Sequence, residues 1–515
     1  MLSNILSLGF KGIDGFSVNV EVDVSSGLPS FNIVGLPDTN IRESRDRVLS
    51  AIKNSGFDIP PKKIVVNLAP SDIKKTGTHY DLPIAIGILL ASGNKIVDSN
   101  IKISEITFIG ELALDGSIKP VAGVLPMLIS VREKNIAKMV VIPYGNEKEA
   151  FLSKVDFCVA RNLKNVFDFI RGEIELEKPK QNLSDDYKSE NNLDMSDVKG
   201  QQFAKRAAEI SAAGFHNMIM IGPPGSGKSM IAKRIPTIMP PMSEEEILET
   251  TKIYSVAGIN KSGLVKDRPF RDPHHTISDI ALIGGGANPK PGEISLAHNG
   301  VLFLDEFPEF SRSSIEALRE PMESYKITVS RVKDSITYPA KFLLVASANP
   351  CPCGYLGHPT RQCACTPIQI KKYRSKLSGP IMDRIDIHID VLPVKFDEWA
   401  GKNYSSETSA GIYERVKKAL DIQIKRFGCV RFNSSMSSKE IKKYCKIDPQ
   451  SLSMLENIMD KMGYSARSLD KIIKIARTIA DLSESVDIKK EHIMEAIHYR
   501  ILDKNISIDG SFAYD

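Results

Sequence analysis

Residues 222–229 read Gly222-Pro223-Pro224-Gly225-Ser226-Gly227-Lys228-Ser229 and follow the apolar run Met218-Ile219-Met220-Ile221. The octapeptide fits the pattern G-x-x-x-x-G-K-[ST], which binds phosphates when a strand precedes it and a helix follows it. Its glycines let backbone N–H groups turn inward around an anion, with the positive end of the following helix behind it. We expect Lys228 to contact the β and γ phosphates of ATP and Ser229 to ligate Mg²⁺.

A second apolar run ends in two acids, and residues 301–306 read Val301-Leu302-Phe303-Leu304-Asp305-Glu306. Such a run is typical of a central parallel strand that is covered on both faces. Ligands of open α/β sheets lie beyond the carboxyl ends of the strands, so these acids are expected to face the nucleotide. We expect Asp305 in the Mg²⁺ shell and Glu306 to polarise the attacking water. The alternative is an acidic helix cap.

The segments around these motifs alternate between strand and helix patterns. A helix is predicted over Gln202–Ala213, with strands over Gly300–Leu304 and Phe342–Ser347, which indicates a parallel α/β sheet. From about Ser437 helix follows helix, including Ser468–Leu482. We therefore predict an α/β core at 198–395 and a C-terminal helical lid at 396–515.

Residues 171–197 lose apolar periodicity and fill with Asp, Glu, Asn, Ser and Lys, which is typical of a linker. Residues 1–170 precede it and are predicted to form an α+β domain. Its expected strands are Ser17–Val24, Lys63–Leu68, Ile106–Ile109 and Met139–Ile142, and its expected helices are Pro83–Ala91 and Leu125–Arg132.

The composition is that of an ordinary globular chain. Of 515 residues, 42% are hydrophobic and 25% charged, which excludes disordered, fibrous and disulfide-framed classes. The length predicts about three domains. A net charge of +5 is a mild excess that neither demands nor excludes DNA.

Neither a leader peptide nor a membrane span is predicted. The first residues carry no basic region, and the longest apolar stretch, Leu82–Ala91, is shorter than the roughly 20 residues that cross a bilayer. We therefore expect a cytoplasmic protein without a membrane partner.

Four of the seven cysteines form two C-x-C pairs separated by a short loop: Cys351, Cys353, Cys363 and Cys365. Four thiolates brought together in this way can surround Zn²⁺, and a reducing compartment favours zinc over disulfides. His358 is the alternative ligand. The scattered cysteines, Cys158, Cys429 and Cys445, are interpreted as structural. The pair His274 and His275, with no acid cluster near it in the sequence, is assigned no role.

The order of further motifs resembles that of AAA+ ATPases. Asn349, after the strand that ends in Ala346-Ser347-Ala348, resembles the sensor 1 residue. Arg384, in the segment 380–386, resembles an arginine finger that enters the neighbouring subunit's site, and Arg467, in 465–468, resembles sensor 2, which reaches the phosphates. Each arginine taken alone is more often a surface ion-pair residue. A finger supplied in trans implies a homo-hexameric ring that is active only when assembled.

Other stretches resemble the magnesium-chelatase-like branch of AAA+ proteins, and most closely its ComM/YifB family. They are residues 268–276, 284–286 and 291–300, together with 198–201, which fits a segment near the adenine. The resemblance spans nearly the whole chain and implies a Lon-protease-like N-terminal domain. The Lon peptidase uses a Ser nucleophile and a Lys base. Here Asp81 or a neighbour stands where that Ser is expected and Leu125 where that Lys is expected, so the domain is predicted to be non-catalytic.

The resemblance implies a hexameric DNA motor that promotes branch migration in homologous recombination or natural transformation. Two strands, 325–331 and 335–338, resemble a pore-lining hairpin, in which Arg331 and Lys333 would contact DNA phosphates. Solvated hairpin charges are an equally good interpretation of these two side chains. A chelatase motor subunit and a protein-remodelling chaperone remain alternative functions, but the N-terminal domain and the cysteine pairs favour the DNA motor.

Overall fold

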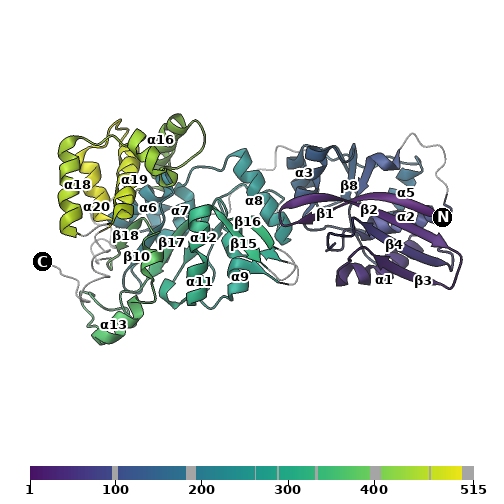
Figure 1. Cartoon of the computed structure of the whole chain (residues 1–515), viewed down its shortest axis with the longest axis horizontal. Coiled ribbons are helices and arrows are strands. Elements are labelled where there is room, and N and C mark those ends of the chain that lie inside the picture. The colour runs from purple at the N-terminus through teal and green to yellow at the C-terminus, as the bar shows by residue number, and fades with distance from the viewer. Residues whose placement is uncertain are drawn as a thin grey trace.

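The computed structural model describes residues 1–94, 102–180, 193–260, 263–286, 289–330, 335–394, 407–462 and 465–500, with the backbone alone at 457–462. The molecule is elongated, with the N-terminal domain at one end and the C-terminal helices at the other (Figure 1). No helix within these ranges combines the length and apolar character that a bilayer span requires.

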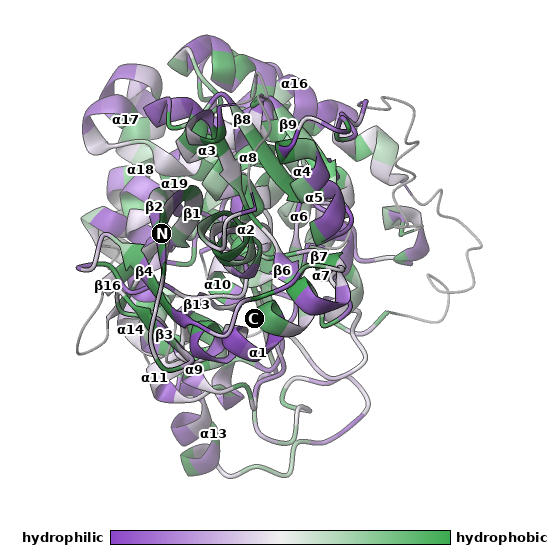
Figure 2. Ribbon diagram, turned by 90° about the vertical axis from the view of Figure 1, so that its right-hand side faces the viewer, coloured by the Kyte–Doolittle hydropathy of each residue, from purple (hydrophilic) through white to green (hydrophobic). Residues whose placement is uncertain are grey.

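The N-terminal domain is built on a seven-stranded mixed sheet in the order β3-β4-β2-β1-β5-β8-β9. The strands are β1 (Leu2–Lys11), β2 (Asp14–Ser25), β3 (Ser30–Val34), β4 (Lys63–Ala69), β5 (Ile106–Phe108), β8 (Met139–Pro143) and β9 (Phe157–Ala160). The main helices are α1 (Thr39–Asn54), α2 (Asp81–Ala91), α3 (Val124–Lys134) and α5 (Leu163–Ile170). Strand β1, which sequence reasoning missed, pairs with β2 along its whole length. Helix α2 is hydrophobic around its circumference and buried in the centre of this domain (Figure 2).

The second sheet carries the phosphate-binding motif and has five parallel strands in the order β11-β14-β17-β10-β18. These are β10 (Met218–Ile221), β11 (Phe270–Arg271), β14 (Val301–Leu304), β17 (Leu343–Ala348) and β18 (Ile387–Asp390). Helix α6 (Gln202–Gly214) precedes β10, and α7 (Lys228–Ile238) and α8 (Glu244–Ala257) lie between β10 and β11. The predicted parallel sheet is confirmed, and β10 has the predicted bounds. Strand β14 is buried throughout, as its apolar run indicates.

The described C-terminal residues form five helices and a short 3-10 turn: α16 (Ser409–Phe427), α17 (Ser438–Tyr444), α18 (Pro449–Met462), α19 (Ala466–Leu482) and α20 (Lys490–His498). Ile412 of α16 and Ile475 of α19 belong to the same hydrophobic cluster as Ala208 of α6 and Ile231 of α7. The C-terminal helices therefore pack on α6 and α7, which lie against the parallel sheet (Figure 1).

Both described ends of the predicted linker are packed. The backbone N–H of Val159 donates to Glu177 (2.9 Å), which adds the residues near 177 to the N-terminal domain. At the other end, Met195 is fully buried in the core cluster, and Arg234 of α7 donates to the carbonyl of Asp194 (2.7 Å). The two domains also meet directly, since the N–H of Gly123 donates to the carbonyl of Ser255 (3.0 Å).

The predicted hairpin is present as β15 (Lys326–Ser330) and β16 (Ser335–Pro339), which pair antiparallel. Its turn, with Arg331 and Lys333, lies outside the described residues.

A buried charge network holds the C-terminal helices together. The carboxylate of Asp481, which is fully buried, accepts hydrogen bonds from Arg426 (2.7 Å), Arg477 (3.1 Å) and Asn433 (2.8 Å). Removal of one partner of such a network leaves an uncompensated buried charge.

We predict that Asp481→Asn destabilises the protein by about 3 kcal/mol, because two buried guanidinium groups lose their counter-charge. Glu484→Gln, which breaks the exposed Lys418–Glu484 pair (2.8 Å), is the control and should leave the stability nearly unchanged. Urea unfolding of both variants measures the difference. Equal midpoints for the two variants would contradict a structural role of the network.

Candidate nucleotide site

The loop after β10 has the shape that its glycines permit. Gly225 and Gly227 have φ angles of 78° and 93°, in the left-handed region that favours glycine. At Gly222 the constraint is space, because a Cβ there would overlap the carbonyl oxygen of Val391 just beyond β18. The N–H of Gly222 donates to Ala348 at the end of β17 (3.1 Å), which fixes the start of the loop.

Lys228, the first residue of α7, turns its ammonium group into the loop. Its Nζ donates to the carbonyls of Gly222 (2.7 Å) and Pro223 (2.8 Å). Burial lowers the pKa of Lys228 to about 8, although the nearby carboxylates of Asp305 and Glu306 act in the opposite direction. A positive charge is thus held within the loop, which suits the binding of polyphosphate.

The two expected magnesium ligands are in contact. The hydroxyl of Ser229 donates to Asp305 Oδ2 (3.0 Å). The other oxygen, Oδ1, accepts from the hydroxyl of Ser347 and from the N–H of Glu306 (3.1 Å). A hydroxyl and a carboxylate at this spacing are the hard oxygen ligands that Mg²⁺ prefers beside nucleotide phosphates, so the residues fit the ion.

Glu306 has a histidine partner that sequence reasoning missed. Its φ angle is 51°, and its Oε2 lies 3.2 Å from Nδ1 of His275. The ring of His275 lies against that of His274, with 4.2 Å between the centroids. The sequence alone assigns this pair no role, but the fold brings it to an acid: β11, which precedes the histidines, is the parallel neighbour of β14, which precedes Glu306. That pairing is long-range, so only the sheet order reveals the contact.

Asn349 lies at the same edge of the sheet as the phosphate loop. It directly follows β17, whose last residue pairs with Ile221 of β10. Gly354 lies close to the phosphate loop and to Asn349, since a Cβ at Gly354 would lie 2.8 Å from Pro224 Cδ and 3.9 Å from Asn349 Cγ. Asn349, the residue predicted to act as sensor 1, therefore lies beside the phosphate loop.

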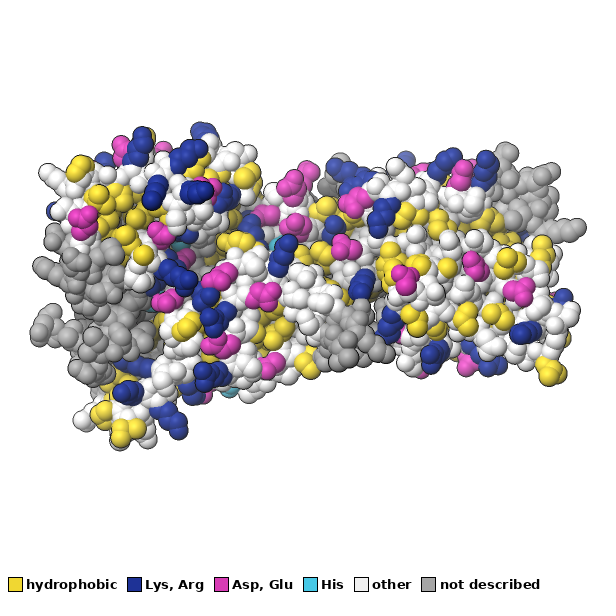
Figure 3. All heavy atoms as spheres, viewed as in Figure 1, with side chains coloured by type: hydrophobic (Ala, Val, Ile, Leu, Met, Phe, Trp, Pro, Cys, Tyr) yellow, Lys and Arg dark blue, Asp and Glu magenta, His cyan; other side chains and the backbone are white. Residues whose placement is uncertain are grey.

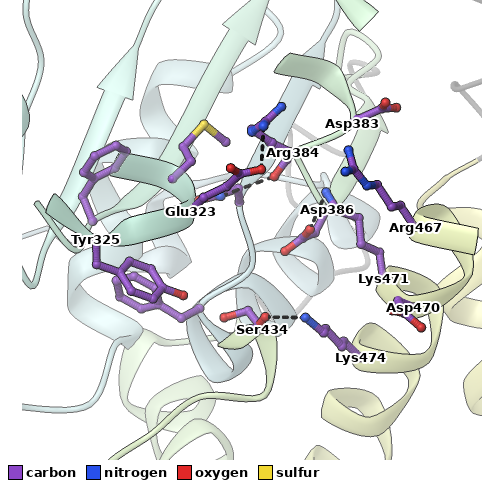
Figure 4. A pocket seen from close by; sticks show the side chains of 14 residues that line it. Glu323, Tyr325, Asp383, Arg384, Asp386, Ser434, Arg467, Asp470, Lys471 and Lys474 are labelled. Atoms are coloured by element: carbon purple, nitrogen blue, oxygen red, sulfur yellow. Dashed lines mark hydrogen bonds and ion pairs between the residues drawn. The ribbon is translucent and has the colours of Figure 1, made fainter. Parts of the chain in front are cut away.

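Arg384 and Arg467 lie together but away from this chain's own phosphate loop. Both line one pocket, with Arg384 paired to Glu323 (2.5 Å) (Figure 4). Arg384 precedes β18 and therefore lies at the amino ends of the strands, whereas the loop follows the carboxyl end of β10, and β10 and β18 run parallel in register. Four residues of strand, about 13 Å, separate these two edges. Arg467 thus does not lie beside Lys228 of its own chain.

The segment that carries Arg384 is fixed by ion pairs. Asp386 accepts from Lys471 of α19 (2.9 Å) and lies 3.1 Å from Nδ1 of His216. Burial acts to raise the pKa of Asp386, but Lys471 and His216 outweigh it and hold that pKa far below its ordinary value. The C-terminal helices therefore position the loop that bears Arg384.

The four predicted cysteines converge. Their Sγ atoms all lie within 4.8 Å of one another, and the pairs that Cys363 makes with Cys351 and with Cys353 are both 3.6 Å. A tetrahedron with Zn–S bonds of about 2.3 Å has sulfur atoms about 3.8 Å apart, so the set fits zinc. The alternative ligand, His358, is outside the cluster, and its Nδ1 accepts from the N–H of Arg361 (3.1 Å).

The other three cysteines differ from one another. Cys158 and Cys445 are buried, in keeping with a packing role. Cys429 is exposed, so packing does not account for it.

Three family models match the chain. The one described as "Magnesium chelatase, subunit ChlI" covers residues 194–399, "Subunit ChlI of Mg-chelatase" covers 20–146, and "Magnesium chelatase, subunit ChlI C-terminal" covers 406–500.

Full-length relatives agree with these models. Uncharacterized protein YifB of Escherichia coli (strain K12) is 43% identical over 509 residues, which cover 98% of each chain. Competence protein ComM of Haemophilus influenzae is 41% identical over 507 residues, 97% of this chain and 98% of that protein. DNA replication licensing factor mcm6 of Dictyostelium discoideum is 23% identical over 323 residues, 59% of this chain and 32% of that protein.

A parallel five-stranded sheet with a phosphate loop and paired acids at its carboxyl edge defines an AAA+-like nucleotide-binding core. Within that class, the chain belongs to the ComM/YifB family of magnesium-chelatase-like proteins.

We predict that Glu306→Gln binds ATP with nearly wild-type affinity but hydrolyses it about 10²- to 10⁴-fold more slowly, because the amide cannot polarise water. Fluorescent-nucleotide titration and a phosphate-release assay measure the two quantities. A hydrolysis rate close to the wild-type rate would remove Glu306 from the proposed role.

Proposed function

We propose that the protein is a ring-forming, ATP-driven DNA motor that promotes branch migration in homologous recombination or natural transformation, with single-stranded or branched DNA as its partner and the cytoplasm as its location. The observation that carries the proposal is the split of the catalytic residues between opposite edges of one parallel sheet. The names of two relatives support the DNA partner, since one is a competence protein and another a DNA replication licensing factor.

The split favours a homo-hexameric ring. Lys228, Glu306 and Asn349 lie at the carboxyl edge, while Arg384 and Arg467 lie at the amino edge. A head-to-tail assembly brings one copy's amino edge to the next copy's carboxyl edge, and such an assembly closes into a ring when the rotation permits. Both arginines would then stabilise the transition-state charge of ATP held by the neighbouring copy.

ATP, Mg²⁺ and Zn²⁺ are the cofactors of this proposal. ATP is held by residues 222–229, Mg²⁺ by Ser229 and Asp305, and zinc by the four cysteines. When bound, Mg²⁺ neutralises charge on the phosphates, while Glu306 orients the attacking water.

The N-terminal domain is proposed to be Lon-protease-like and to bind rather than cleave. Asp81 is buried and pairs with Arg47 (2.8 and 3.1 Å), and Leu125 is buried in α3. Neither residue supplies a nucleophile or a base of the Ser–Lys type. Burial raises the pKa of Asp81 to about 6, although Arg47 opposes this shift.

A chelatase motor subunit is the second candidate, favoured by the descriptions of all three family models. A protein-remodelling chaperone uses the same ring. The partner that stimulates ATP hydrolysis discriminates among the three.

We predict that single-stranded or forked DNA stimulates the ATPase rate and that the stimulation fades as salt rises, because phosphate contacts release counterions. The assay compares two salt concentrations, with Glu306→Gln as the hydrolysis-deficient control. A high basal ATPase rate that no DNA changes would contradict the proposal of a DNA motor and favour a protein or chelatase partner.

We predict that Lys228→Ala and Arg384→Ala are each inactive but regain activity when mixed. In a random mixture about one interface in four joins an intact phosphate loop to an intact finger of the next copy. Phosphate release from the mixture and from each variant alone measures the effect. If the mixture stays as inactive as its components, Arg384 does not act in trans.

We predict about one zinc per chain by elemental analysis, retained in Cys429→Ser and lost in Cys363→Ser and Cys365→Ser, since three thiolates hold zinc more weakly than four. The control replaces the exposed cysteine outside the cluster. Purified wild-type protein without stoichiometric metal would refute the zinc assignment.

A further inference from the structure

The segment that carries the four cysteines has an unusual charge. Residues 335–382 contain six Lys or Arg and no Asp or Glu, although 63 acids in 515 residues would place about six acids in a segment of that length. Within it, the loop and α13 (Pro367–Arg374) form a projection, residues 351–376, which we call the basic arm. Figure 1 shows α13 at the end of this projection, and Figure 3 shows Lys, Arg and hydrophobic side chains on its surface.

Not all five cations of the basic arm are available to a partner. Lys376 pairs with Glu309 (2.8 Å). Arg374 is half-buried beside Cys351, where it offsets part of the formal charge of about −2 that four thiolates and one Zn²⁺ would carry. The remaining three, Arg361, Lys371 and Lys372, are exposed, and within the described part of the chain no ion pair involves them.

The arm is anchored at its base, and its helix is capped. Cys351 is fully buried at the base of the arm, and α13 begins with a capping box between Thr366 and Gln369. The guanidinium of Arg361 lies over the ring of Tyr355, 5.1 Å from its centroid, and donates to its hydroxyl (2.8 Å). An Arg–Tyr pair can stack on a base, and the exposed lysines of α13 on the same arm add charges for the phosphates.

We infer that the basic arm is a contact surface for the phosphate backbone of single-stranded or branched nucleic acid, an inference that rests on the proposed DNA motor and names the surface it would use. Charge complementarity selects the partner. A membrane surface suits it less, because α13 has eight residues and its exposed large apolar side chain is Ile368 (80% exposed), whereas an interfacial helix needs an apolar face.

The basic arm also contacts the nucleotide site, so nucleic acid bound to the arm can affect the loop that binds ATP. Gly354, between the first two cysteines and the arm's tip, packs on Pro224 of the phosphate loop and beside Asn349. Any shift of the arm therefore reaches two elements that surround the ATP phosphates.

The test compares two triple variants of the full-length protein with equal loss of charge. The first is Arg361→Gln/Lys371→Gln/Lys372→Gln. The matched control is Lys417→Gln/Lys425→Gln/Lys439→Gln, which changes exposed lysines of the C-terminal helices. Binding of a labelled single-stranded oligonucleotide is measured by fluorescence anisotropy over a salt series, together with basal and DNA-stimulated ATPase rates, zinc content and melting temperature.

The arm variant should bind the oligonucleotide about 10- to 100-fold more weakly near 0.1 M salt. The slope of the logarithm of its binding constant against the logarithm of the salt concentration should be smaller in magnitude by about 2, because each phosphate contact on a single strand contributes about 0.7 to that slope. Its basal ATPase rate, zinc content and melting temperature should equal those of the control, while DNA stimulation is lost. Unchanged DNA binding of the arm variant would overturn the inference and leave the DNA motor standing.

Two further outcomes distinguish a failure of the proposed DNA motor from a failure of the inferred contact surface. Wild-type protein that binds no DNA would overturn the proposed function itself. Binding to vesicles of anionic lipid that the arm variant loses, without any effect on DNA binding, would overturn the choice of partner.

Discussion

The hydrogen bond from Ser229 to Asp305 joins the two halves of the nucleotide site, and the other parts are arranged around it. It requires the ends of β10 and β14 to lie at one edge, although β17 separates them in the sheet. β17 fills the gap with Ser347, whose hydroxyl donates to the same carboxylate. Parallel strands place all three carboxyl ends together, and α7 begins at that edge with Lys228.

The same parallel arrangement places the arginines at the opposite edge. Because β18 runs beside β10 in the same direction, residues that precede β18 cannot reach the loop that follows β10. The C-terminal helices strengthen this division, since Lys471 holds the Arg384 segment through Asp386 and Arg467 lies in the same pocket. In one copy the phosphate loop and the two arginines therefore lie at opposite edges of the sheet, and the proposed head-to-tail assembly would bring them together.

Local sequence signals predicted the parts of the fold that local chemistry decides. The run 218–221 gave a strand with correct bounds, and residues 222–229 gave the loop and the start of α7. The C-x-C spacing brought four sulfurs together as expected. The features that the sequence did not predict depend on long-range strand pairing. Strand β1 is recognisable only through its pairing with β2. The contact of His275 with Glu306 follows from the order of the strands in the sheet. The position of Arg467 depends on how α19 packs, which no local pattern encodes.

The most direct measurement is the ATPase rate per chain as a function of protein concentration, with the mass of the assembly followed by light scattering on the same samples. An active site completed by a neighbour predicts a rate per chain that is near zero for the monomer and rises in parallel with the fraction of rings. A dilute monomer that hydrolyses ATP at the full rate per chain would contradict the account.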